Sequence, residues 1–200
     1  IGKKDVVVEV GPGEGTLTEF LLEKAKKVIA IEKDRKMVEF LKEKFAKEIR
    51  EEKLEIVTGD ILDPQLENKY HLVGNIPYYI TGALFKKALE SENQPRSITF
   101  VVQKEVADRI MAKDGKESIL SISIKAYGKP EFGDVIKAGS FNPRPKVNSA
   151  IISVRNISKE RFLFAQQKSS MRKVWPSEAR KSEDFSKRSF SAEHLSEKIF

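Results

Sequence analysis

Four consecutive residues, Asn75-Ile76-Pro77-Tyr78, combine side chains that could hold a planar amine. The short apolar run 70–74 before them predicts a buried strand that glycine stops, where a parallel strand opens onto a cleft. Asn75 offers a carbonyl acceptor, and Pro77 lacks an N–H and fixes its local backbone, so nearby carbonyls can point outward. Tyr78 offers a flat face on which a base can stack. The stretch suits an exocyclic amine on a planar ring, but a strand-to-helix turn with a packed tyrosine explains these four residues equally well.

A glycine-rich loop, Gly11-Pro12-Gly13-Glu14-Gly15, follows a β-branched run that begins at Val6. A lone loop of this kind is a weak indication of a nucleotide site, and Thr16 stands where the dinucleotide pattern requires its third glycine. The carboxylates of Glu9 and Glu14 flank the loop and would repel a pyrophosphate resting on the helix N-terminus. S-adenosylmethionine has no phosphate and carries a cationic sulfonium and a cationic ammonium. The acidic loop therefore favours this cofactor.

Three further strand ends carry polar side chains that a cofactor could use. Glu32 ends the second predicted strand, 17 residues after Gly15, and can accept hydrogen bonds from two ribose hydroxyls. Asp60 ends the third strand and can accept a hydrogen bond from the adenine amino group, and Asn75 follows the fourth. Taken singly, Glu32 and Asp60 are most often solvated acids at strand ends. The loop and these residues on four successive strand ends together predict a cofactor site.

The elements that must position these residues alternate between strands and helices, which predicts an α/β fold with a mostly parallel sheet. Apolar runs predict strands over 6–10, 28–31, 54–57, 70–74 and 98–102, and a closing pair over 132–138 and 150–154. Helical spacing predicts helices over 16–26, 35–50, 81–89 and 104–112. Asp34 can cap the second of these helices. Residues 118–127 fit a helix or, by their Ser/Ile alternation, a strand.

Length and composition indicate one domain of ordinary size with a small appendage. The chain has 200 residues, of which 40% are hydrophobic and 34% charged, and it has no cysteine. The lack of cysteine excludes thiolate catalysis and Cys-based zinc sites, and it fits a cytoplasmic protein. Only two histidines occur, without partners at ligand spacing, so we expect no metal site. No apolar run approaches the roughly 18 residues that span a membrane, and we expect no membrane partner.

The charge is unevenly distributed along the chain. The net charge of +7 favours a polyanionic partner. Residues 159–200 hold ten Lys/Arg against six Asp/Glu, together with eight serines and few large apolar side chains. We therefore expect residues 1–156 to form one α/β domain and residues 157–200 to form a small, basic, partly disordered helical region.

Several of these segments together resemble the ribosomal RNA adenine N6-dimethyltransferases of the KsgA type. They are residues 9–15, Glu32, Gly59-Asp60, residues 75–78, residues 102–107 and residues 141–150. The resemblance covers roughly residues 5–155, and its last two segments are specific to this family. It implies a Rossmann-like class I S-adenosylmethionine-dependent methyltransferase fold, with a seven-stranded, mostly parallel sheet and a small C-terminal helical appendage.

The resemblance also implies a role for individual residues. The S-adenosylmethionine site would be lined by Gly11, Gly13, Glu32, Asp60, Ile61 and Asn75. The catalytic residues would be Asn75, Pro77 and Tyr78. Asn75 and the Pro77 region would hold the target amine, and Tyr78 would contact the flipped adenine together with Phe141. The implied reaction dimethylates N6 of two adjacent adenosines in small-subunit (16S) ribosomal RNA during ribosome maturation. The implied partner is ribosomal RNA within the immature small ribosomal subunit, and we expect a cytoplasmic monomer.

The chain departs from the family pattern at two places. The family has a Gly-Gln-Asn-Phe-Leu-like segment before its first strand, which closes over cofactor and target, and this chain starts just after it. Residues 161–200 keep only fragments of the family's C-terminal helical domain.

The expected chemistry is a direct displacement. The exocyclic amine of adenine is a poor nucleophile because its lone pair is delocalised into the ring. Acceptors at Asn75 and at a backbone carbonyl near Pro77 would localise that pair and aim it at the methyl group, so positioning and electrostatics drive the transfer without a general base of shifted pKa. The target base must leave its stack.

Three other functions share parts of the pattern. A large-subunit rRNA adenine N6-methyltransferase of the antibiotic-resistance type has the same Asn-Ile-Pro-Tyr pattern, but residues 103–105 and 141–150 argue against it. A dinucleotide-dependent oxidoreductase would use the same fold, but the acidic loop and Thr16 argue against it. A non-catalytic RNA-binding ribosome assembly factor on the same fold is the third.

Overall fold

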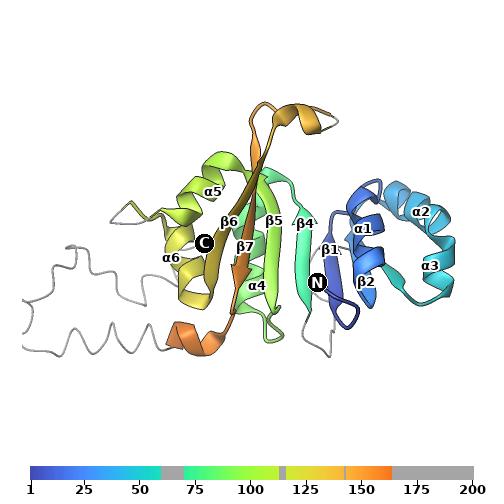
Figure 1. The fold of residues 1–200 in the computed structure, drawn as a ribbon, viewed down its shortest axis with the longest axis horizontal. Coiled ribbons are helices and arrows are strands. Elements are labelled where there is room, and N and C mark those ends of the chain that lie inside the picture. The colour runs from blue at the N-terminus through green and yellow to red at the C-terminus, as the bar shows by residue number, and fades with distance from the viewer. Residues whose placement is uncertain (60–69, 113–115, 142, 164–200) are drawn as a thin grey trace, which may run out of the picture.

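The computed structural model describes residues 1–59, 70–112, 116–141 and 143–163 (Figure 1). In chain order, the first half contains β1 (Val6–Val10), α1 (Thr16–Lys24), β2 (Lys27–Glu32), α2 (Arg35–Lys44), α3 (Ala46–Arg50), β3 (Leu54–Thr58) and β4 (His71–Asn75). The second half contains the 3-10 turn η1 (Tyr78–Ile80), α4 (Thr81–Glu90), β5 (Ser97–Gln103), α5 (Lys104–Met111), α6 (Ile119–Tyr127), β6 (Lys129–Ile136), the 3-10 turn η2 (Ala138–Ser140) and β7 (Ser149–Arg155). The predicted alternation of strands and helices is confirmed.

One seven-stranded sheet runs through the molecule in the order β3-β2-β1-β4-β5-β7-β6. Every pairing is parallel except those of β7, which is antiparallel to β5 and to β6. Strand order reverses at β1, since Val10 pairs with Ile31 of β2 on one side and with Gly74 of β4 on the other. The crevice at such a reversal is where open α/β sheets bind their ligands.

Both faces of the sheet are buried, which explains why its central strands are continuously apolar. Successive side chains of a strand point to opposite faces. Val7 and Val28 therefore pack in one cluster with Leu21 and Leu41 of α1 and α2. Val8 and its neighbours on the other face pack with residues of α4, α5 and α6, which are Leu84, Phe85, Ile110 and Ile124.

The helix predicted over residues 35–50 begins as expected, because the Asp34 side chain accepts a hydrogen bond from the Lys36 N–H at 2.8 Å. It is not continuous, however, and α2 and α3 are separated at Phe45, whose ψ is 28°. Phe45 is only 5% exposed, and a Cβ added at Gly15 would lie 2.5 Å from its ring. The helix is therefore interrupted where this ring packs beneath the glycine loop. The spacing of the apolar residues alone predicted one continuous helix.

Residues 118–127, which fitted either a helix or a strand, form helix α6 from Ile119 to Tyr127. The serines that produced the ambiguity satisfy their hydroxyls on helical carbonyls. Ser121 donates to the Ile110 carbonyl and Ser123 to the Ile119 carbonyl, both at 2.8 Å. The alternation therefore reflects local hydrogen bonding and the packing of α6 on α5.

The closing strands are present, but β6 spans 129–136 in place of the predicted 132–138. It begins earlier because Lys129 pairs with Arg155, and its register shifts between Phe132 and Val135. Most of the region 157–200 lies outside the described residues, so the division into two domains stays a prediction. Within the described ranges, no helix has the length and apolar character that crossing a membrane requires.

Candidate active site

The parallel register brings four of the predicted strand ends to one edge of the sheet. The Gly11 N–H donates to the Ile31 carbonyl at 3.0 Å, and the Gly59 N–H donates to the Glu32 carbonyl at 3.0 Å. A Cβ added at Gly11 would lie 4.0 Å from the Asn75 carbonyl oxygen. Glycine loop, Glu32 and Asn75 are thus neighbours, as their positions in the sequence predicted.

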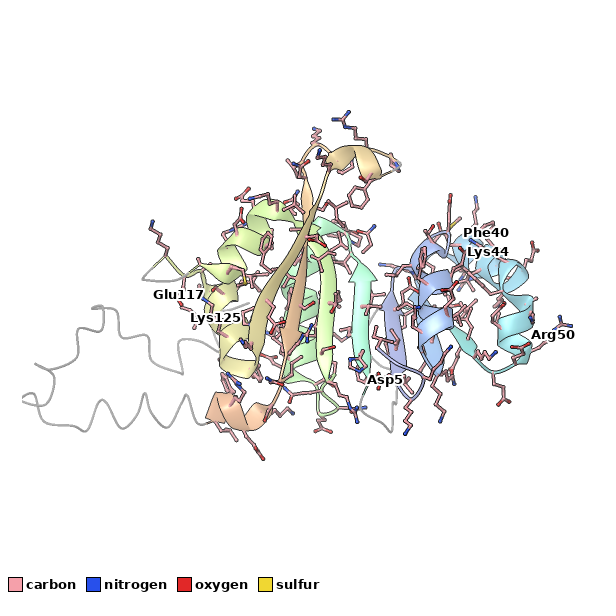
Figure 2. The ribbon with its side chains drawn as sticks, in the orientation of Figure 1. Asp5, Phe40, Lys44, Arg50, Glu117 and Lys125 are labelled. Carbon is pink, nitrogen blue, oxygen red and sulfur yellow. The ribbon has the colours of Figure 1, made fainter. Side chains whose placement is uncertain are left out.

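The glycine loop between β1 and α1 adopts backbone conformations that favour glycine. Gly11, Gly13 and Gly15 have φ values of 64°, 55° and 82°. A Cβ added at Gly13 would meet no atom of the described residues within 4 Å, so the loop borders open space among them at this point. Lys44 at the end of α2, labelled in Figure 2, donates to the Glu14 carbonyl at 2.8 Å and pairs with Glu19 at 2.8 Å. These contacts hold the outer side of the loop.

The side chain of Glu32 is held in place by the backbone of the two residues that follow it. Its Oε1 accepts hydrogen bonds from the N–H groups of Lys33 at 2.8 Å and Asp34 at 2.9 Å. Its Oε2 faces the glycine loop, with the Gly13 N–H at 3.4 Å, a distance at which a hydrogen bond is weak. One carboxylate oxygen therefore fixes the side chain, and the other is directed toward the loop and can accept further hydrogen bonds.

Glu9 lies elsewhere than the sequence suggested. The sequence placed it at the flank of the loop, but its side chain is 1% exposed and its Oε2 accepts a hydrogen bond from the Thr18 hydroxyl at 2.6 Å. Burial raises the pKa of Glu9 to about 7, and the Thr18 hydrogen bond opposes that rise. Glu9 thus ties β1 to α1 beneath the loop, and Glu14 is the exposed acid. A carboxyl within a valine run and a threonine two residues into the helix were the signals for this contact.

The stretch that begins at Asn75, the last residue of β4, is positioned by the residues on either side of Asn75. A Cβ added at Gly74 would lie 2.7 Å from the Val10 carbonyl, so only glycine lets β4 approach β1 here. Ile76 is 2% exposed and anchors the stretch in the core, whereas Asn75 and Pro77 are exposed. The stretch is therefore pinned at one residue and open at the two that carry the predicted acceptors.

The carbonyl groups of this stretch are not equivalent. The Pro77 carbonyl accepts the Ile80 N–H at 3.2 Å and so begins the turn η1. The Ile76 carbonyl lies beyond the β4–β5 ladder, which ends at Asn75, and accepts no backbone hydrogen bond from the described residues. The carbonyl near Pro77 that can face a ligand is therefore that of Ile76.

Of the remaining predicted site residues, the structure describes Phe141 but not the others. Phe141 is half-buried and follows the turn η2, with its N–H donating to the Ala138 carbonyl at 3.4 Å. Its segment reaches the same edge of the sheet, because Ser149 at the start of β7 pairs with Gln103 at the end of β5. Asp60, Ile61 and the side chain of Tyr78 lie outside the described residues.

Among the residues that the structure describes, no group of three or more acidic or histidine side chains is arranged to hold a metal ion. The described part of the site consists of glycine backbone, the carboxylate of Glu32, the amide of Asn75 and the ring of Phe141. These groups can accept hydrogen bonds from hydroxyls, amines and cations.

Comparison with known proteins agrees with this arrangement. Residues 1–169 match the family model described as ribosomal RNA adenine dimethylase. The chain is 43% identical over 156 residues to the ribosomal RNA small subunit methyltransferase A of Dehalococcoides mccartyi strain BAV1, covering 75% of this chain and 53% of the relative. It is 36% identical over 167 residues to the protein of the same name from Fusobacterium nucleatum, covering 81% and 62%. The chain thus spans only about half to three fifths of the length of these relatives.

Two solved structures share both fold and sequence with this chain. A dimethyladenosine transferase from Plasmodium falciparum superposes with a TM-score of 0.72 and 32% identity, over 86% of this chain and 63% of the other. The 23S rRNA methyltransferase ErmE gives a TM-score of 0.70 and 32% identity, over 78% and 62%. The fold is that of the class I S-adenosylmethionine-dependent methyltransferases, and the chain belongs to the ribosomal RNA adenine dimethylase family.

Proposed function

We propose that this chain transfers methyl groups from S-adenosylmethionine to N6 of two adjacent adenosines in small-subunit (16S) ribosomal RNA, and that it dimethylates them during ribosome maturation. The proposal is carried by one observation: the glycine loop, Glu32 and Asn75 lie together where the strand order reverses at β1, in a chain of this family. The names of its relatives in bacteria give the substrate class.

The cofactor fits the chemistry of the loop. Open space at Gly13 and the outward oxygen of Glu32 suit a ribose whose two hydroxyls donate to that oxygen. Gly11 and Asn75 would line the methionine end, and Asp60 with Ile61 would hold the adenine. The exposed carboxylate of Glu14 favours a cation over a pyrophosphate, as the sequence indicated. S-adenosylmethionine supplies an electrophilic methyl group on its sulfonium.

The residues at the end of β4 would prepare the nucleophile. The Asn75 side-chain carbonyl and the Ile76 carbonyl beside Pro77 would each accept one N–H of the adenine amine, which localises the nitrogen lone pair and directs it at the methyl group. Tyr78 and Phe141 would stack on the flipped adenine. The proton then leaves to water, so no side chain has to act as a general base.

We propose a monomer as the working unit. The proposed partner is the immature small ribosomal subunit, and the proposed compartment is the cytoplasm where that subunit matures.

Two measurements test the proposal. Calorimetry should show binding of S-adenosylmethionine and none of NAD. Transfer of tritiated methyl should then occur on immature small ribosomal subunits and not on protein-free 23S ribosomal RNA, the substrate class of ErmE. Transfer to 23S RNA alone would show that the substrate is large-subunit ribosomal RNA. Binding of NAD would contradict the assignment as a methyltransferase.

A further inference from the structure

The connection between β6 and β7, residues 137–148, carries positive charge without any acid. We call it the β6–β7 arm, and the structure describes all of it except Asn142. It holds Lys137, Arg144 and Lys146, and no Asp or Glu occurs anywhere between Asp134 and Glu160. Figure 1 shows the arm projecting beyond the ends of the strands. The three cations are exposed.

These cations differ from many others on the molecule. Lys27, Lys44 and Lys104 pair with carboxylates at 2.6, 2.8 and 2.7 Å. No cation of the arm makes an ion pair with a carboxylate of the described residues, although Arg155 in the adjoining strand pairs with Glu131 at 3.1 Å. The charge of the arm is therefore available to an external anion.

The arm is held in a fixed conformation at its base. Asn148 accepts the Ala138 N–H on its side-chain oxygen at 3.0 Å, and its backbone carbonyl accepts the Lys104 N–H at 3.0 Å. One residue thus closes the arm and attaches it to the start of α5. Pro143 and Pro145 restrict the backbone on either side of Arg144. A loop ordered in advance loses little entropy when it binds.

The arm also lies beside the proposed target site. It carries Phe141, and it returns to the sheet at Ser149, opposite Gln103 of β5. Asn75 pairs with Val101 of the same strand β5, two residues before Gln103. A flipped adenine between Asn75 and Phe141 would leave its neighbouring phosphates at the arm.

We propose that the β6–β7 arm is a phosphate-binding surface that grips the RNA strand next to the flipped adenine through Lys137, Arg144 and Lys146. This inference rests on the proposed function, since it is RNA bound at that site that the arm would hold. Phosphodiesters are the matching partner because a single strand presents regularly spaced anions to an acid-free loop whose base is fixed by Asn148.

The size of the effect follows from counterion release. Each phosphate neutralised on a single strand contributes about 0.7 to the slope of log affinity against log salt. Three contacts therefore contribute about 2 to the slope. Between 50 and 200 mM salt, a wild-type chain should lose roughly 20-fold more affinity than a chain without these charges.

The test measures binding of a short single-stranded RNA oligonucleotide of mixed sequence across that salt range. The arm variant carries Lys137→Gln, Arg144→Gln and Lys146→Gln. A matched control carries Lys4→Gln, Lys24→Gln and Lys26→Gln, three exposed lysines at the opposite edge of the sheet.

We expect the slope to fall by about 2 in the arm variant and to change little in the control. A charge-retaining variant, with Lys137→Arg, Arg144→Lys and Lys146→Arg, should keep the wild-type slope. If the triple substitution unfolds the chain, the three single variants replace it, each with an expected loss of about 0.7. Equal slopes in the wild type and the arm variant, or an equal loss in the control, would overturn the proposal.

Methyl transfer measured on the same preparations separates this inference from the function on which it rests. If the wild type transfers methyl groups and the arm variant keeps the wild-type slope, RNA binding by the arm is refuted and the proposed reaction is kept. The expected slopes without any methyl transfer by the wild type would support the arm and refute the proposed reaction.

Discussion

The buried carboxyl of Glu9 should make the stability of this fold depend on pH. Its pKa is about 7 in the folded protein, against an ordinary value of 4.5, because burial disfavours the charged form. The folded state then holds this proton more tightly than the unfolded chain does. Between pH 4.5 and 7, rising pH therefore lowers the free energy of unfolding, and above pH 7 the loss is complete.

The loss amounts to about 3 kcal/mol, since each pH unit between the two pKa values is worth about 1.4 kcal/mol. Glu9→Gln removes the charge and keeps an oxygen that can accept the Thr18 hydroxyl. The variant should match the wild type at pH 4 and exceed its free energy of unfolding by about 3 kcal/mol at pH 8.

Urea denaturation of both proteins at intervals from pH 4 to pH 8 measures this difference. The matched control is Glu14→Gln, which removes the exposed carboxylate of the same loop. Thr18→Val removes the hydrogen bond that lowers the Glu9 pKa, so it should move the transition to higher pH. A stability difference between Glu9→Gln and wild type that stays constant with pH would refute the reasoning.

Three further predictions concern the proposed site. Glu32→Ala should weaken S-adenosylmethionine binding by about 2–4 kcal/mol, because two charge-assisted hydrogen bonds are lost; calorimetry measures this, and unchanged affinity would remove the ribose from Glu32. Asn75→Ala should leave the melting temperature unchanged and lower tritiated methyl transfer by roughly two to three powers of ten, whereas full activity would contradict its assignment to the target amine. Tyr78→Ala should weaken capture of the target adenine by about 1–3 kcal/mol, measured as the KM for RNA. Tyr78→Phe keeps the ring and should stay near wild type. If both variants lose the same affinity, the hydroxyl is the group that acts and the stacking role is refuted.

The strand ends were predictable from the sequence because the physics that fixes them is local. A β-branched run followed by glycine, or by a single acid, identifies both the strand and the edge at which it stops. Parallel pairing then brings those ends together without further information. Gly11, Glu32 and Asn75 accordingly lie where their spacing indicated.

What the sequence did not predict depends on contacts between distant segments. The break at Phe45 coincides with packing of its ring beneath Gly15, 30 residues earlier in the chain, and helical periodicity carries no trace of that contact. The burial of Glu9 likewise depends on how α1 lies across β1. The position of the β6–β7 arm depends on antiparallel pairing of β7 with β5, which hydrophobic patterns do not specify.

The single residue that closes the β6–β7 arm also makes the arm separable from the sheet. Because Ala138 and Asn148 are joined by a hydrogen bond of 3.0 Å, the loop between them is closed at its base. Doubling such a loop costs only about 0.6 kcal/mol in closure entropy. The arm can therefore be exchanged or lengthened as a unit while Asn148 is kept, which offers a place to insert different sequences at the proposed RNA-binding surface without changing the strand ends.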